Sequence, residues 1–143
     1  MKKLLIISMI FLSNNLHAEW IFVAENTGDS QGRGKGDITY IWSSYYTDEN
    51  KSEDFREFKI LQKHKNPMRL SSAQKKAGLK GSIYRSSIAN IEVYCNQPNR
   101  IFMAKTEYYK SDMGTEIQDS WDYNQWINIP SYTPAAIAVR MVC

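Results

Sequence analysis

Two long runs of alternating apolar and polar residues constrain the fold more than any other feature of the sequence. The first run, Ser86 to Cys95, places Ala89, Ile91 and Val93 on one side. The second run, Arg100 to Lys110, follows after a short segment of turn-forming residues. Alternation with a period of two is typical of β-strands, and a short polar turn between two strands makes an antiparallel hairpin. The sequence therefore predicts a central β-hairpin.

Shorter segments on both sides of the hairpin extend the β pattern. We predict further strands at Trp20–Ala24, Ile38–Tyr46, Phe55–Lys63 and Thr115–Trp121. For Phe55–Lys63 a helix is the alternative interpretation, because Phe55, Phe58 and Leu61 also fit a helical stripe. The polar segment from Asn66 to Gly81 is expected to be a long connection, with one or two helical turns between residues 71 and 79.

The first eighteen residues have the three-part pattern of a secretory signal peptide. Lys2 and Lys3 precede a short apolar run, and a polar segment then ends at the small residue Ala18. A membrane-spanning anchor needs about twenty apolar residues, which is more than this run supplies. We expect residues 1–18 to be the signal peptide, cleaved after Ala18, and residues 19–143 to form one domain. That domain is expected to be exported to the periplasm, the cell surface or the medium, with no transmembrane segment.

The two cysteines connect the predicted sheet to the C-terminal segment. Cys95 ends the first strand of the hairpin, and Cys143 is the last residue of the sequence. An exported chain with two cysteines most simply forms one disulfide, and only one pairing is possible. Thr133 and Pro134 are typical of an N-cap and a first helical position, which predicts a short helix over residues 135–142. The expected fold class is α+β: an antiparallel sheet of five or six strands, with a C-terminal helix on one face tied to it by the disulfide.

The charges are distributed unevenly along a chain that is almost neutral overall. Without Lys2 and Lys3, 16 basic and 15 acidic residues remain. No acidic residue occurs from Phe58 to Ile91, and we call the stretch from Lys59 to Arg85 within it the basic segment. Such a distribution indicates one basic surface. The cations of this segment are Lys59, Lys63, Lys65, Arg69, Lys75, Lys76, Lys80 and Arg85.

Several short motifs follow one another in the second half of the sequence. They are Val93-Tyr94-Cys95, Arg100-Ile101-Phe102, Tyr108-Tyr109, Met113-Gly114, the stretch from Trp126 to Ser131, and Cys143. Taken in this order, they resemble the surface-adhesin protein E family of bacterial exported proteins. The resemblance implies an antiparallel sheet with a C-terminal helix tethered by one disulfide. It also implies binding to host matrix proteins and dimerisation.

The residues that usually perform catalysis or bind metals do not form a recognisable set. The glycine-rich stretch at residues 32–36 does not have the spacing of a phosphate-binding loop, and we interpret it as a connection between strands. His64 is the single histidine after residue 18, and its neighbours Lys63 and Lys65 disfavour a bound cation. We therefore expect no enzymatic activity, no metal and no other cofactor.

Binding is the class of function that these observations favour. The basic segment is a candidate contact surface, although a solvated loop with the same charges would look identical in sequence. Tyr108 and Tyr109 are further candidates, because adjacent residues of a strand face opposite ways and exposed tyrosines are common at interfaces. Ordinary packing of both rings is the alternative interpretation.

The expected partners follow from that surface. A host extracellular-matrix protein or an acidic glycan would complement the cations, and no nucleic acid is expected. An edge strand could pair with a second copy of the chain to form a homodimer. The competing function is that of a structural or assembly protein that remains in the periplasm and never contacts the host.

Overall fold

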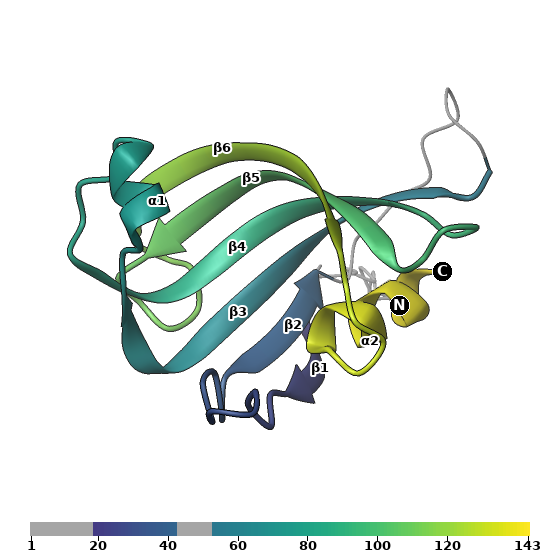
Figure 1. Cartoon of the computed structure of the whole chain (residues 1–143), viewed down its shortest axis with the longest axis horizontal. Coiled ribbons are helices and arrows are strands. Elements are labelled where there is room, and N and C mark those ends of the chain that lie inside the picture. The colour runs from purple at the N-terminus through teal and green to yellow at the C-terminus, as the bar shows by residue number, and fades with distance from the viewer. Residues whose placement is uncertain (1–18, 43–52) are drawn as a thin grey trace, which may run out of the picture.

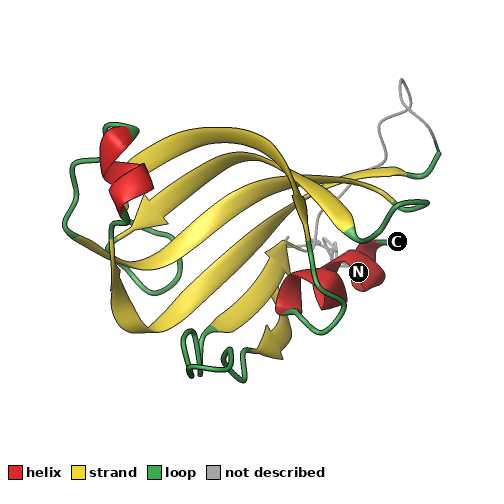
Figure 2. Ribbon diagram, viewed as in Figure 1, coloured by secondary structure: helices red, strands yellow, loops and turns green. Residues whose placement is uncertain are grey.

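The computed structural model describes residues 19–42 and 53–143, which form one curved sheet and two helices (Figure 1 and Figure 2). The predicted signal peptide lies outside the described residues, as does the end of the strand predicted at Ile38–Tyr46. The elements are β1 (Trp20–Glu25), β2 (Ile38–Trp42), β3 (Phe55–Arg69), α1 (Ser72–Lys76), β4 (Ile83–Tyr94), β5 (Arg100–Tyr109), β6 (Ile117–Asn128) and α2 (Pro134–Val142).

The six strands pair antiparallel in their order along the chain, so each connection joins neighbouring strands. The sheet is strongly curved, with α2 beneath its concave face beside β1 and β2, and with α1 at the opposite end (Figure 1). The predicted fold class is confirmed, including the number of strands and the position of the helix. The hairpin of β4 and β5 is also confirmed, whereas β6 starts two residues later than predicted and continues to Asn128.

β3 is longer than the sequence suggested. The predicted strand ended at Lys63, but β3 continues to Arg69, so the expected connection is correspondingly shorter. The pairing of β3 with β4 is interrupted after Lys63 and resumes where Met68 lies opposite Tyr84. Pro67 falls in this interruption, where its missing N–H removes no hydrogen bond from the ladder. Pro67, which by sequence alone indicates the end of a strand, therefore lies inside β3 where the pairing with β4 is irregular.

The burial pattern of β3 also explains why its sequence resembles a helix. Phe55, Phe58 and Leu61 are all buried at a spacing of three residues. Phe58 belongs to the core beneath α2, whereas the side chain of Leu61 lies close to Gly114 in the β5–β6 loop. Successive side chains of a strand point to opposite faces, so this spacing buries residues on both sides. The helical alternative is wrong, and the three-residue spacing arises because both faces of the sheet are covered here.

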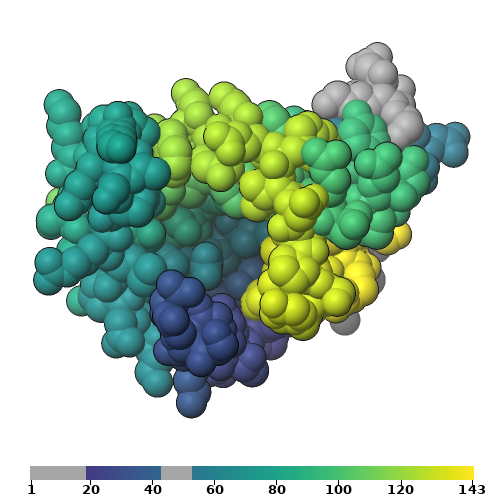
Figure 3. Space-filling model, viewed as in Figure 1, coloured from purple at the N-terminus to yellow at the C-terminus, as the bar shows by residue number. Residues whose placement is uncertain are grey.

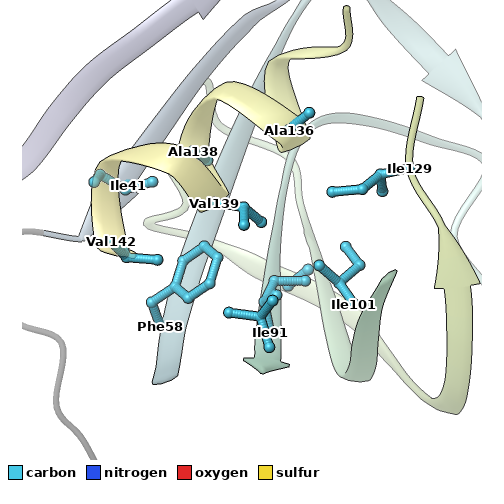
Figure 4. Packing of buried hydrophobic residues seen from close by; sticks show 11 residues of the cluster. Ile41, Phe58, Ile91, Ile101, Ile129, Ala136, Ala138, Val139 and Val142 are labelled. Atoms are coloured by element: carbon cyan, nitrogen blue, oxygen red, sulfur yellow. The ribbon is translucent and has the colours of Figure 1, made fainter. Parts of the chain in front are cut away.

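The main core lies between α2 and the concave face of the sheet. Ala138 and Val139 are 0% and 1% exposed, and they belong to one cluster with Phe58, Ile91 and Ile101 (Figure 4). Burying one Val, Ile or Phe side chain contributes about 1.5–3 kcal/mol. Packing of the helix on the sheet is therefore a large part of what stabilises the domain.

Both ends of α2 are fixed. The hydroxyl oxygen of Thr133 accepts a hydrogen bond from the N–H of Ala136, which confirms the predicted N-cap. At the other end, Cys143 is joined to Cys95, the residue after β4, and their Cα atoms are 5.5 Å apart. The predicted disulfide is thus confirmed. It closes a loop with a sequence separation of 48 residues and ties the end of the helix to the sheet.

The helix α1 is short and is held by its own cap. The Ser71 hydroxyl oxygen accepts a hydrogen bond from the N–H of Gln74, and Oε1 of Gln74 accepts one from the N–H of Ser71. Leu70 and Leu79, which flank α1, pack against tyrosines of β4 and β5 and form a second apolar cluster. This cluster is separate from the one beneath α2 and fixes α1 to its end of the sheet.

The loop between β5 and β6 folds over the outer face of the sheet. The buried hydroxyl of Ser86 donates a hydrogen bond of 2.6 Å to the carbonyl of Ser111 and accepts one of 3.1 Å from the N–H of Gly114. Gly114 has a φ of 70°, and a Cβ at this position would lie 2.7 Å from Cδ1 of Ile88. Only glycine satisfies both conditions without a shift of the loop.

β1 and β6 are the two edges of the sheet. Each carries an exposed aromatic side chain, since Phe22 is 57% and Trp126 is 43% exposed. Pairing of an edge with a second copy of the chain stays a prediction. Over residues 19–42 and 53–143, neither helix has the length and apolar character that crossing a bilayer requires.

Candidate functional site

The basic segment gathers at one end of the molecule. From Lys63 onward it comprises the second half of β3, α1 and the start of β4, which are teal in Figure 1 and Figure 3. Seven of its eight cationic side chains are exposed, and Lys63 is partly exposed. Within the described parts of the chain, no ion pair involves any of these eight side chains. The segment is therefore built partly from a strand and a helix, and its charges face solvent.

Three cations of the basic segment surround a small hollow at the end of the sheet. Lys63, Lys65 and Arg85 line it together with Asp112, His64, Gly36 of the loop before β2 and Ile38 at the start of β2, and its volume is about 330 Å³. Lysine and arginine side chains around a concavity strengthen a local positive potential, because the low-dielectric wall focuses the field. The arrangement suits an anionic group such as a sulfate, phosphate or carboxylate of a larger partner.

The remaining cations lie on and after α1. Lys75 and Lys76 occupy its last turn, where they also complement the negative end of the helix dipole. Lys80 follows in the connection to β4, and its backbone N–H lies 3.3 Å from an oxygen of Asp119. The other Asp119 oxygen accepts a hydrogen bond of 2.7 Å from the N–H of Gly81. Asp119 thus anchors this connection to β6 and is the acidic neighbour of the lysines.

The expectation that Tyr108 or Tyr109 is exposed is wrong. Their exposed fractions are 6% and 8%. Tyr108 packs into the apolar cluster beneath α1, whereas Tyr109 pairs with Ser86, which the β5–β6 loop covers on the outer face. Alternation leaves one residue of a pair exposed only where one face of the sheet is open, and here both faces are covered. Both rings are buried, which agrees with the alternative interpretation of ordinary packing.

A partly exposed aromatic cluster lies elsewhere, on β4, β5 and β6. The ring of Trp126 stacks on Tyr94 with a centroid distance of 6.2 Å, and it contacts Phe102 at 5.4 Å. The guanidinium carbon of Arg100 lies 5.4 Å from the Trp126 ring centroid, within the range of a cation–π contact. This cluster was not predicted from the sequence. It forms because Phe102 and Trp126 lie opposite each other in β5 and β6, and the strand predicted at Thr115–Trp121 ended before Trp126.

The concave face contains a larger cavity between α2 and the end of the sheet that carries α1. Its volume is about 380 Å³, and Figure 3 shows this side of the molecule hollowed between the loop after β1, the N-terminal part of α2 and the strands. Isoleucine and methionine side chains of β3, β4, β5 and β6 line much of it. His64 lies at its polar end, with Tyr84 and Tyr108 nearby.

His64 forms a buried pair with Asp37 that the sequence analysis missed. The distance from Nδ1 of His64 to Oδ2 of Asp37 is 2.8 Å, and both side chains are more than nine-tenths buried. Oδ1 of Asp37 accepts a hydrogen bond of 3.0 Å from the N–H of Lys65. The flanking Lys63 and Lys65 are more exposed than His64, as alternation along β3 requires. The two lysines therefore do not surround the imidazole as their place in the sequence suggested.

The tyrosines at this end of the cavity are held by Gln74 of α1. Burial raises the pKa of Tyr84 and of Tyr108, and an interaction of each hydroxyl with the Gln74 side chain partly offsets that effect. The ring of Tyr84 meets His64 edge to face at 5.3 Å and Tyr108 at 4.7 Å. His64, the two tyrosines and Gln74 thus form one packed polar group.

Comparison with known proteins places the fold and the sequence in one family. A sequence model described as "Surface-adhesin protein E" matches residues 29–143. The chain belongs to the surface-adhesin protein E family. No curated protein matches the sequence significantly. The resemblance seen in the second half therefore extends over most of the domain, including β2 and β3.

A solved structure of the family's namesake has the same fold. The structure of Haemophilus influenzae protein E matches with a TM-score of 0.55 and 16% sequence identity, covering 87% of this chain and 92% of that one. At this identity the likeness concerns the fold. The likeness in fold extends over most of both chains.

Proposed function

We propose that this protein is an exported, adhesin-like binding protein that contacts an acidic host-matrix protein or glycan through its basic segment. Membership in the surface-adhesin protein E family is the observation that carries the proposal. The solvent-facing cations at one end of the sheet supply a surface of the right charge. A role without catalysis is consistent with this family and is part of the proposal.

The basic segment would hold a partner through the sum of several weak charge contacts. A single exposed ion pair contributes less than about 1 kcal/mol, so one lysine could not hold a macromolecule. Several cations that face one partner add their contributions and raise the rate of encounter. The hollow bordered by Lys63, Lys65 and Arg85 and the lysines on and after α1 both belong to this end of the molecule. A sulfated or carboxylated polymer could contact both groups at once.

A charge-reversal experiment tests the proposal. Lys75, Lys76 and Lys80 are each replaced by Glu, and binding is measured on immobilised heparin and on an immobilised matrix protein over a range of salt concentrations. The wild type should bind and should be released by salt, because exposed charges are screened over about 8 Å at physiological ionic strength. The variant should lose retention while its circular dichroism and its disulfide are unchanged.

A matched variant separates a local surface from a net-charge effect. Arg100, Lys105 and Arg140 lie outside the basic segment, and replacing these three by Glu changes the net charge by the same amount. The proposal requires that this control keeps most of its retention. Equal losses in the two triple variants, or no loss in either, would reject the basic segment as the contact surface.

A further inference from the structure

The cavity on the concave face has the composition of a small-molecule site. Its volume of about 380 Å³ falls within the range of about 300–1,000 Å³ that such sites occupy. Ile60, Ile91, Ile101 and Met103 supply apolar walls, and the polar residues gather toward His64. Among the described residues that line the cavity, none is Asp, Glu, Lys or Arg. About half of the lining side chains are polar, and a site with apolar walls on one side and polar groups on another binds a ligand in one orientation.

The unusual feature of this cavity is one atom of His64. Its side chain is only 5% exposed, and Nε2 has no hydrogen-bond partner, although it is buried. The great majority of buried polar side-chain atoms are hydrogen-bonded, so an atom without a partner needs an explanation. The hydroxyls of Tyr84 and Tyr108, at the same end, each interact with Gln74. Nε2 is thus a fully buried side-chain atom at this end that has no hydrogen-bond partner among the described residues.

The contact with Asp37 determines whether Nε2 donates or accepts a hydrogen bond in the neutral ring. An ionised carboxylate only accepts hydrogen bonds, so Nδ1 of His64 must carry the hydrogen that it donates to Oδ2 over 2.8 Å. In a neutral imidazole the other nitrogen is then a hydrogen-bond acceptor. Asp37 is itself fixed, because its second oxygen accepts from the N–H of Lys65 and its carbonyl accepts from the N–H of Asn26. The ring is therefore held in place before any ligand arrives.

We propose that this cavity binds a small neutral molecule with a compact apolar body and one hydroxyl or N–H group, which donates a hydrogen bond to Nε2 of His64. The apolar body would lie against the isoleucines of β3, β4 and β5. A carboxylate is disfavoured, because no Lys or Arg among the described lining residues would compensate its charge and Asp37 lies directly behind the imidazole. His64 belongs to the basic segment in sequence, but the proposed site uses the concave cavity rather than the exposed cations, and it does not depend on adhesion.

Three probes with one skeleton test this chemistry: 2-naphthol, 2-methylnaphthalene and 2-naphthoate. They are similar in size and differ in carrying a hydrogen-bond donor, a methyl group or an anion. Dissociation constants measured by fluorescence or ligand-observed NMR should show 2-naphthol binding at least tenfold more tightly than the other two. Undetectable binding of 2-naphthol, or equal binding of 2-naphthol and 2-methylnaphthalene, would overturn the proposal.

The imidazole nitrogens provide a direct readout. In protein that begins at Glu19 and carries no histidine tag, His64 is the sole histidine, so its two nitrogen resonances need no separation from others. Nε2 should give the resonance of an unprotonated nitrogen, and 2-naphthol should shift it while 2-methylnaphthalene should not. A Nε2 resonance that does not respond to bound 2-naphthol would contradict the proposed hydrogen bond. A water molecule that keeps this nitrogen occupied would give the same result and would contradict the proposal equally.

Two variants distinguish this cavity from other apolar surfaces. His64→Asn retains an N–H donor for Asp37 but lacks Nε2, and it should abolish the preference for 2-naphthol over 2-methylnaphthalene. Ala89→Leu narrows the cavity from its apolar side and should weaken binding of both probes. If His64→Asn does not fold, Ala89→Leu still decides whether the probes occupy this cavity. Unchanged binding in Ala89→Leu would reject it.

Discussion

Nδ1 of His64 in β3 lies 2.8 Å from Oδ2 of Asp37, the residue that ends the long loop between β1 and β2. The same loop is closed by backbone hydrogen bonds from the N–H of Asn26 to the carbonyl of Asp37 and from the N–H of Gly36 to the carbonyl of Asn26. One buried contact therefore connects the glycine-rich loop to the strand that carries half of the basic segment. It also orients the imidazole at the polar end of the cavity.

Asp37→Ala should destabilise the protein through this contact. The substitution removes the acceptor for Nδ1 of His64, which stays buried, and for the partly buried N–H of Lys65. Breaking a buried polar pair from one side costs about 3 kcal/mol. Urea denaturation should show that loss. Asp29→Ala, in the same loop but exposed, should have a much smaller effect. Equal midpoints for Asp37→Ala and the wild type would show that the pair does not stabilise the fold.

Cys143→Ser should destabilise the protein by about 2–5 kcal/mol, the usual loss when a small secreted domain loses its disulfide. Without the link to Cys95, α2 has nine residues and is too short to persist by itself, so it should fray first. Hydrogen exchange of the α2 amides and the thermal midpoint report these two effects. Met141→Ser, at an exposed position of the same helix, is the matched control. A Cys143→Ser midpoint equal to that of the control would mean that the disulfide is not structural.

Stability should fall with rising pH above the ordinary tyrosine pKa of 10.0. Burial raises the pKa of Tyr84, Tyr108 and Tyr109, and the hydrogen bond of Tyr109 to Glu107 raises the last further. Below that pH these hydroxyls are protonated in both states and do not affect the free energy of unfolding. Above it, the unfolded chain releases protons that the folded chain retains, so unfolding becomes more favourable.

Urea denaturation at about pH 8 and about pH 11 measures this dependence, since each unit of pKa difference is worth about 1.4 kcal/mol. Tyr109→Phe removes one of the three contributions and should reduce the loss between the two pH values. A stability that stays constant across this range, with absorbance showing ionised tyrosine in the folded protein, would contradict the burial of these hydroxyls.

Purified material from cells should begin at Glu19 and contain no free thiol. The basic, apolar and polar order of residues 1–18 motivates the expected cleavage after Ala18. Intact mass should show the loss of eighteen residues and of two hydrogens, the latter for the Cys95–Cys143 disulfide. A chain that retains Met1, or that reacts with a thiol reagent before reduction, would contradict this expectation.

The elements that could be predicted from the sequence are those with a local cause. The hairpin of β4 and β5 follows from alternation over ten residues, and α2 follows from the Thr133 cap and Pro134 at its start. The disulfide could be predicted without knowledge of the fold, because two cysteines allow only one pairing. The end of β3 was missed because Pro67 indicates a break, and only the pairing with β4 shows that the strand resumes after it.

The candidate site was less predictable, because its contacts join distant residues. Asp37 and His64 are 27 positions apart, and neither has a neighbour that indicates a polar pair. The available signal was that His64 continues the period-two series of Phe58, Ile60 and Gln62 along one face of β3. Exposure and packing of Tyr109 both stayed open for a related reason, since the loop that covers its face of the sheet comes from the next hairpin.

Adhesin-like binding to a host molecule requires that the protein reaches the outer surface of the cell. Protease treatment of intact cells tests this most directly. The basic segment offers exposed lysines and arginines to trypsin, and three of them, Lys75, Lys76 and Lys80, lie within six residues at the end of α1 and just after it. The mature protein should disappear from intact cells while a periplasmic marker survives. Protein that survives with the marker, and is degraded only after the envelope is opened, would contradict surface display and favour a structural or assembly role in the periplasm.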